Sequence, residues 1–99
     1  MLTPKQRAQL RSLAANLPEV TQVGKGGISE NLITAADDAL STKELIKIKV
    51  LENSGLNSLD AGRQIAEGTG AELVAAIGRT FILYRESQKL KPEKRIKLV

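Results

Sequence analysis

The sequence contains no cysteine and no histidine, and its aromatic residues are limited to Phe81 and Tyr84. These absences exclude disulfides, Cys nucleophiles, His general bases, Fe–S clusters and zinc sites built on Cys or His. Serine and threonine chemistry would have to work without its usual base. Because aromatic side chains are so few, the core must be aliphatic and surfaces for base stacking are sparse.

Long apolar segments are also missing. No apolar run approaches the ~18 residues that a membrane span needs, and the first residues, Met1 to Gln6, lack the apolar region of a secretory signal. At 99 residues the chain has the size of one domain. We expect a cytoplasmic protein that binds no membrane and no small-molecule substrate; its oligomeric state stays open, with a monomer favoured.

Charge is distributed unevenly along the chain. Residues 1–18 carry three basic residues and no acidic one, and residues 19–84 carry six basic and nine acidic residues. Residues 85–99 carry six basic and two acidic residues, and the whole chain has a net charge of +4. Two basic ends around an acidic middle indicate an anionic partner, of which nucleic acid is the usual one.

Caps, periodicity and glycines predict seven elements. Thr3 with Pro4 and Gln6 matches a capping box, and Ser29 and Ser58 begin the later helices. The predicted elements are a helix from Pro4 to about Asn16, a strand at 20–23, a helix after Ser29, a strand at 43–52, a helix from Ser58 to Gly70, and strands at 71–77 and 80–84 joined by a Gly78–Arg79 turn.

The order α-β-α-β-α-β-β predicts an α/β fold. Alternation of helices and strands favours parallel pairing, and the closing hairpin adds an antiparallel strand, which together give a four-stranded mixed sheet with helices packed on it. We expect one domain over residues 1–86 and a loosely ordered basic tail over residues 87–99.

Apolar periodicity predicts the buried faces. Ile46, Ile48 and Val50 make one face of the central strand, and Lys47 and Lys49 lie on the other. The helices are predicted to bury the following residues: Leu10, Leu13, Ala14 and Leu17; Leu32, Ala36, Ala39 and Leu40; Leu59, Ile65 and Ala66.

A glycine-rich segment, Gly24-Lys25-Gly26-Gly27, lies between a predicted strand and a predicted helix. Glycines allow close approach of a ligand to the backbone, the following helix offers free N–H groups, and Lys25 adds a cation. Loops of the form G-x-x-G clamp the nucleic-acid backbone in the KH module. A tight structural turn is the alternative interpretation.

Further cations could extend such a surface. Lys5, Arg7 and Arg11 belong to the first helix, Lys47 and Lys49 to the central strand, and Arg85 to the exit of the last strand. The alternative is that they form an ordinary solvated surface.

Several stretches together resemble the YhbY family, also called the CRM domain (chloroplast RNA splicing and ribosome maturation). They are, in family order, Thr3 to Arg7, Val23 to Gly27, Glu44 to Lys49, Thr69 to Ala71, Ile77–Gly78 and Leu83 to Arg85. Lys43 departs from the family, which commonly has histidine there. The resemblance implies a fold similar to the C-terminal domain of bacterial translation initiation factor three, and binding to RNA of the large ribosomal subunit precursor.

We therefore predict a non-enzymatic RNA-binding protein that needs no cofactor or metal and acts on ribosomal RNA during ribosome assembly. Its interface is predicted to be Gly24 to Gly27 with Lys5, Arg7, Arg11, Lys47, Lys49 and Arg85. Two alternatives remain. One is a protein-interaction module in which the glycine loop is only a turn. The other is a small phosphate-handling enzyme, which would need a carboxylate cluster beside that loop, where only Glu30 is close in sequence.

Overall fold

A computed structural model describes residues 2–99 and contains the seven predicted elements in the predicted order. Short 3-10 helices follow β2 and β4. The elements are α1 (Pro4–Ala14), β1 (Glu19–Val23), α2 (Glu30–Lys43), β2 (Leu45–Val50), η1 (Glu52–Ser54), α3 (Ser58–Thr69), β3 (Glu72–Ile77), β4 (Thr80–Tyr84) and η2 (Pro92–Lys94).

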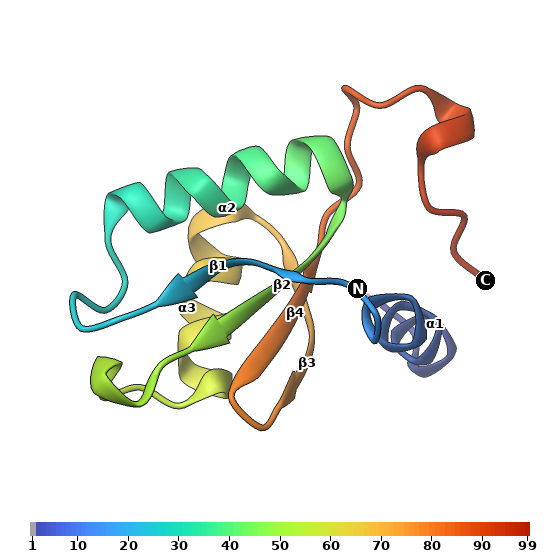
Figure 1. Ribbon diagram of the computed structural model, residues 1–99. Coiled ribbons are helices and arrows are strands. Elements are labelled where there is room, and N and C mark those ends of the chain that lie inside the picture. The colour runs from blue at the N-terminus through green and yellow to red at the C-terminus, as the bar shows by residue number, and fades with distance from the viewer. Residues whose placement is uncertain (1) are drawn as a thin grey trace.

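The strands form one mixed sheet in the order β1-β2-β4-β3. β1 pairs in parallel with β2, whereas β4 lies between β2 and β3 and is antiparallel to both. In Figure 1, α2 and α3 cover one face of the sheet and α1 lies against the other. The predicted α/β fold with a four-stranded mixed sheet is confirmed.

Local sequence signals set the helix ends. Thr3 caps α1 with both hydrogen bonds of the capping box, its hydroxyl accepting from the Gln6 N–H and the Gln6 side chain accepting from the Thr3 N–H. α3 ends at Gly70, whose φ of 72° is the left-handed conformation that glycine adopts most easily. α1 ends at Ala14, two residues before the predicted Asn16.

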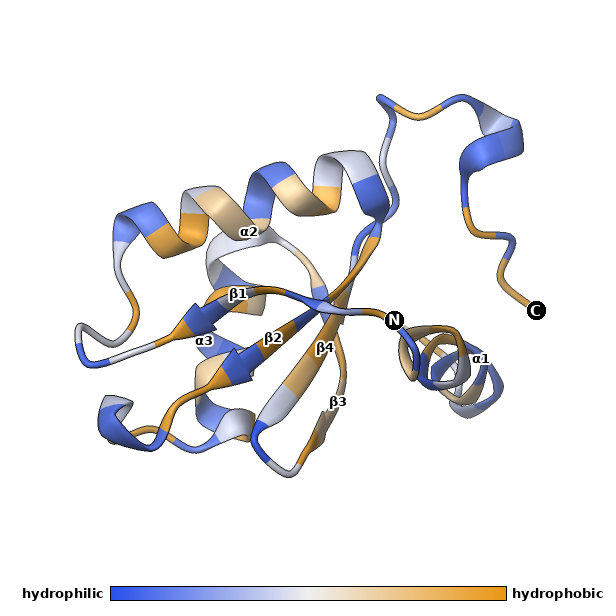
Figure 2. Ribbon diagram, in the orientation of Figure 1, coloured by the Kyte–Doolittle hydropathy of each residue, from blue (hydrophilic) through white to orange (hydrophobic). Residues whose placement is uncertain are grey.

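Two apolar clusters lie on opposite faces of the sheet. Ile46, Ile48 and Val50 of β2 are buried beneath α2 and α3, as predicted. Leu45 faces the other way and packs with the α1 side chains Leu10 and Ala14. Figure 2 shows the resulting alternation along β2 between hydrophobic and hydrophilic residues. The alternating sequence therefore gives both faces of the sheet their own core.

The two aromatic residues fill different clusters. Phe81 packs with α2 and α3, and Tyr84 packs on the α1 side. α3 approaches the sheet closely at Gly62, where a Cβ atom would lie 2.8 Å from Leu73 Cδ1 and 3.1 Å from Phe81 Cγ. A side chain at that position would force the helix or its neighbours to move.

Three details of the prediction are wrong. The central strand is shorter than 43–52, because Lys43 ends α2 and Glu44 turns the chain with a φ of 63°. Leu13 and Leu59 are 49% and 42% exposed although their spacing predicted burial. The buried apolar stripes of α1 and α3 are therefore narrower than the apolar spacing in their sequences predicted.

After β4 the chain loops away through η2, and its last residues return to lie beside α1 (Figure 1). The Gln9 side chain donates to the Lys97 carbonyl at 2.8 Å and accepts from the Val99 N–H at 3.0 Å. Ile96 and Leu98 pack against the cluster that contains Leu10 and Tyr84. The sequence predicted a loosely ordered tail over 87–99; these contacts hold parts of it against the domain, and the domain boundary at residue 86 stays a prediction.

Within residues 2–99, no helix combines the length and the apolar character required to cross a membrane.

Candidate nucleic-acid interface

The glycine loop is a tight turn that leaves its backbone accessible. The Gly27 N–H donates to the Gly24 carbonyl at 2.9 Å, so that Lys25 and Gly26 form the tip. Gly27 has a φ of 66°, a conformation that favours glycine, and a Cβ atom at Gly26 or Gly27 would have no neighbour within 4 Å. Lys25 is exposed. A phosphate could therefore reach this backbone without displacing any side chain.

The loop leads into the amino end of α2. Ser29 caps this helix, and its hydroxyl accepts from the Leu32 N–H at 3.1 Å. The first N–H groups of a helix lack partners within it and carry the positive end of its dipole, which favours an anion nearby. Glu30 lies in this first turn. Among residues 2–99, no three carboxylates are grouped where they could hold a metal ion.

Two more cations lie at the same end of the sheet. β1 and β2 are parallel, with Gln22 beside Lys49 and Val23 beside Val50, so the loop leaves the sheet next to the end of β2. Lys49 is exposed on the face opposite the α2–α3 core. In the β3–β4 turn, Arg79 is exposed and its Nε donates to the Val50 carbonyl at 2.9 Å. Lys25 and Lys49 therefore lie at and beside the glycine loop, and Arg79 lies at the same end of the sheet on the other side of β2.

The cations of α1 lie elsewhere and differ in their contacts. Lys5 and Arg11 are exposed. Arg7 is half-buried, and its Nη1 donates to the carbonyls of Leu73 at 2.6 Å and Val74 at 3.0 Å. These carbonyls lie where the β3–β4 register shifts. Arg7 therefore attaches α1 to β3 and satisfies carbonyls that the irregular ladder exposes.

Lys47 is also engaged, since its Nζ donates to the Ala15 carbonyl at 3.3 Å, just past the last turn of α1. A cation at this position interacts favourably with the carboxyl end of a helix. Lys47 therefore connects the middle of β2 to α1.

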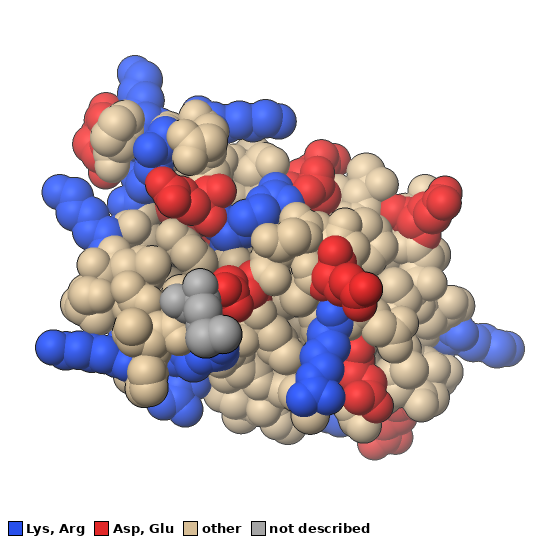
Figure 3. Space-filling model, turned by 180° about the vertical axis from the view of Figure 1, so that it is seen from behind, with Lys and Arg blue, Asp and Glu red and all other residues tan. Residues whose placement is uncertain are grey.

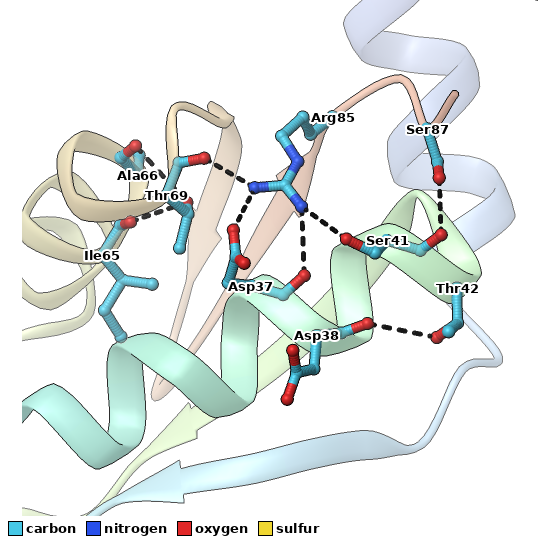
Figure 4. A network of polar contacts seen from close by, with 9 residues as sticks. All are labelled: Asp37, Asp38, Ser41, Thr42, Ile65, Ala66, Thr69, Arg85 and Ser87. Atoms are coloured by element: carbon cyan, nitrogen blue, oxygen red, sulfur yellow. Dashed lines mark hydrogen bonds and ion pairs between the residues drawn. The ribbon is translucent and has the colours of Figure 1, made fainter. Parts of the chain in front are cut away.

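Arg85 connects α2, α3 and β4 (Figure 4). Its Nη1 lies 2.5 Å from Asp37 Oδ1 and 2.7 Å from the Thr69 carbonyl, and its Nη2 donates to the Asp37 carbonyl and the Ser41 hydroxyl, both at 3.0 Å. The side chain is 22% exposed. This guanidinium serves as a structural cross-link, and its predicted contact with RNA stays a prediction.

The predicted site residues thus occupy three places rather than one. Lys49 joins the glycine loop, Lys5, Arg7 and Arg11 follow α1, and Arg85 lies at the α2–α3 junction. Figure 3 shows basic side chains gathered over α1 and the C-terminal segment, and more acidic side chains over the opposite side of the molecule.

Tyr84 lies in the core rather than on the surface, with 7% of its area exposed. Burial raises the pKa of its phenol, with smaller contributions from the negative charges of Glu44 and Glu86. A buried phenol is no platform for a nucleic-acid base, which agrees with the sparse aromatic content.

Sequence reasoning missed Glu44. This side chain is fully buried, and its two carboxylate oxygens accept from the N–H groups of Ser87 and Ile96, each at 2.7 Å. A charged residue between a helix and an apolar strand was the available signal, since buried carboxylates need hydrogen-bond partners. Glu44 therefore holds the C-terminal segment at two points.

The chain resembles known proteins over most of its length. A family model described as the CRS1/YhbY (CRM) domain matches residues 2–85. The Bacillus subtilis protein YqeI, named a probable RNA-binding protein, is 43% identical over 91 residues, which cover 92% of this chain and 95% of YqeI. A Haemophilus influenzae protein named an RNA-binding protein is 33% identical over 91% of both chains.

A solved structure agrees with the fold. The solution structure of a hypothetical protein from Staphylococcus aureus superposes with a TM-score of 0.76 at 41% identity and covers 100% of both chains. The family match includes the glycine loop, the central strand and Arg85, and it ends before the C-terminal segment. The chain therefore belongs to the CRS1/YhbY (CRM) domain family.

Proposed function

We propose that this protein binds RNA without catalysing a reaction, and that its target is ribosomal RNA of the large-subunit precursor during assembly in the cytoplasm. It acts as a monomer and needs no cofactor. Family membership and the RNA-binding names of its relatives support RNA as the partner.

The glycine loop is the observation that carries the proposal. Its backbone is accessible, it precedes a helix amino end, Lys25 lies at its tip, and Lys49 and Arg79 lie at the same end of the sheet. Phosphate contacts of this kind fix the position of the RNA without reading its sequence. Lys5 and Arg11 form a separate basic surface on α1. Arg7 and Lys47 add positive potential from their structural positions, and Arg85, which is paired with Asp37, stays a predicted contact.

Gly26 offers the sharpest test of the loop. Its φ lies outside the left-handed region and its surroundings are open, so Gly26→Asp adds a negative charge without the backbone strain that Gly27→Asp would bring. We expect Gly26→Asp to weaken RNA binding by about tenfold or more. Lys25→Ala should weaken it less and by similar factors for different RNA sequences. Fluorescence anisotropy with an RNA fragment measures both.

Ala35→Asp is the matched control, because it adds the same charge at an exposed position of α2. This variant should retain most of the affinity, and all variants should melt within a few degrees of the wild type. Unchanged affinity of a folded Gly26→Asp protein would show that the loop is only a turn.

The ribosomal target needs a separate experiment in cells. Crosslinking followed by sequencing of the bound RNA should enrich large-subunit ribosomal RNA over other abundant RNAs. Enrichment spread evenly over messenger and transfer RNA would support RNA binding but contradict the proposed ribosomal target.

One observation favours the alternative of a protein-interaction module. An apolar groove of about 460 Å³ is lined by Leu13, Leu17, Leu45, Ile96 and Lys43. Leu13, which is half exposed, forms part of it. If the module interpretation holds, Leu13→Glu should abolish association with the large subunit while RNA affinity in vitro stays unchanged. If RNA binding directs association, Gly26→Asp should abolish it instead.

A further inference from the structure

The fold brings the two basic ends of the chain together. Residues 1–18 have a net charge of +3 and residues 85–99 have a net charge of +4, against −3 for all the residues between them. The end of the C-terminal segment lies beside α1, where the Gln6 and Gln9 side chains donate to the carbonyls of Val99 and Lys97. Residues separated by about ninety positions therefore lie side by side, and the two segments together carry a net charge of +7.

We call this the tail–α1 surface and define it by its exposed cations. They are Lys5, Arg11, Lys89, Lys91, Lys94 and Lys97. Two acidic residues, Glu86 and Glu93, lie in the same segment, and the Glu86 carboxylate is 3.9 Å from Arg95. The exposed lysines therefore keep most of their charge available to an anion.

The lysines of this surface are held in place at both ends of the segment. The buried Glu44 carboxylate accepts from Ser87 before the lysines and from Ile96 among them. The Ser87 hydroxyl donates to the Ser41 carbonyl, and Ile96 and Leu98 pack into the α1-side cluster. A backbone that is already ordered loses less entropy when its side chains bind a partner.

The tail–α1 surface and the glycine loop lie at opposite ends of the molecule. In Figure 1 the β1–α2 loop projects from one end, and α1 and the C-terminal segment lie at the other. The longest dimension of the molecule is 39 Å. A four-nucleotide strand, the length that a G-x-x-G loop holds in the KH module, would engage one of these surfaces at a time.

We propose that the tail–α1 surface is a second phosphate-binding surface, and that the protein therefore selects folded RNA that presents two separate stretches of backbone. This inference rests on the proposed function and adds the class of RNA to it. The glycine loop binds one stretch, and the lysines positioned by Glu44 bind a duplex phosphate backbone at the other end of the molecule.

The test compares two RNA probes, a single-stranded tetranucleotide and a hairpin with a single-stranded flank. A variant with Lys91→Gln, Lys94→Gln and Lys97→Gln should bind the hairpin about tenfold more weakly, and its salt dependence should fall by about 0.9 for each lost phosphate contact. Its affinity for the tetranucleotide should stay within twofold of the wild type. Arg63→Gln, an exposed cation on α3, is the control and should change neither affinity.

Glu44→Gln separates positioning from charge. It raises the net charge from +4 to +5, so simple electrostatics predicts tighter RNA binding. Loss of the positioned tail predicts weaker binding to the hairpin and unchanged binding to the tetranucleotide, which is the result we expect. Tighter binding of this variant to the hairpin would overturn the positioning role of Glu44.

If the triple lysine variant binds the hairpin with the affinity and salt dependence of the wild type, the proposal of a second surface is wrong, while the glycine-loop function stands. Failure of the wild-type protein to bind either RNA would overturn the proposed function itself. The lysines are exposed, so the triple variant should fold normally, and its melting temperature verifies this.

Discussion

Replacing the buried Glu44 with glutamine should release the C-terminal segment without unfolding the domain. The carboxylate accepts two backbone hydrogen bonds of 2.7 Å, from Ser87 and Ile96. Glutamine has nearly the same shape but only one accepting oxygen, and its amide group would face the second N–H. Hydrogen bonds to charged groups contribute about 1.5–3 kcal/mol each. We therefore expect the docked segment to lose about 2–3 kcal/mol of stability.

Amide hydrogen exchange measured by NMR follows this change residue by residue. A loss of about 2–3 kcal/mol corresponds to exchange of the Ser87 and Ile96 amides that is about 30- to 150-fold faster, if they exchange through local opening. The amide of Ile48 in β2 should keep its protection. Glu93→Gln, a change of an exposed residue in η2, is the matched control and should alter neither region.

Two results would refute this reasoning. Unchanged protection of both Ser87 and Ile96 would mean that Glu44 does not hold the segment. Equal loss of protection at these amides and at Ile48 would mean that Glu44 stabilises the whole domain rather than the docked segment.

Three further predictions concern stability. Ile48→Ala should cost about 2–5 kcal/mol in chemical denaturation, because the side chain is fully buried beneath α2 and α3 and leaves a cavity; a loss below about 1 kcal/mol would place the core on the other face. Arg85→Lys should cost about 1–3 kcal/mol in the same assay, because an ammonium group cannot reach Asp37, Ser41 and Thr69 together; a change within about 0.5 kcal/mol would contradict the cross-link. Burial raises the pKa of Tyr84 above 10.0, so the unfolded state releases the phenol proton first. The stability that this group contributes is complete below about pH 10 and falls as the pH rises through the folded pKa. Denaturation at several alkaline pH values should show this fall in the wild type and a smaller one in Tyr84→Phe; equal falls would contradict it.

Local signals explain why the element order could be predicted from the sequence. Capping at Thr3 and Ser29, the left-handed glycine at position 70 and the alternation along β2 each depend on neighbours within about five positions. The sheet order could not be predicted from such signals, because it depends on the pairing of β2 with β4, which are separated in the sequence by α3 and β3.

The exposed leucines show the limit of periodicity. Leu13 has the helical spacing of a core residue, but the sheet and the C-terminal segment do not cover that side of α1, and it borders the groove instead. Spacing predicts which residues share a helix face, whereas the width of the buried stripe depends on what packs against it.

The sequence predicted which residues make up the candidate site but not how they are arranged in space. The glycine loop is local, and its turn and helix cap follow from its own residues. The partners of Arg7 and Arg85 are distant in sequence, and most of them are backbone carbonyls, which no residue pattern identifies. The same holds for Glu44, whose bonds span 43 and 52 positions.

The salt dependence of RNA binding tests the central claim most directly. If the glycine loop and the cations beside it neutralise about four phosphates of a single-stranded RNA, the logarithm of the association constant should fall with the logarithm of salt concentration with a slope of about −3. Fluorescence anisotropy of the wild-type protein, from low to physiological salt and beyond, measures this slope. We predict a slope near −3 that becomes shallower by about one in Lys25→Ala. A slope near zero, or no binding at physiological salt, would contradict the phosphate-binding role of the glycine loop.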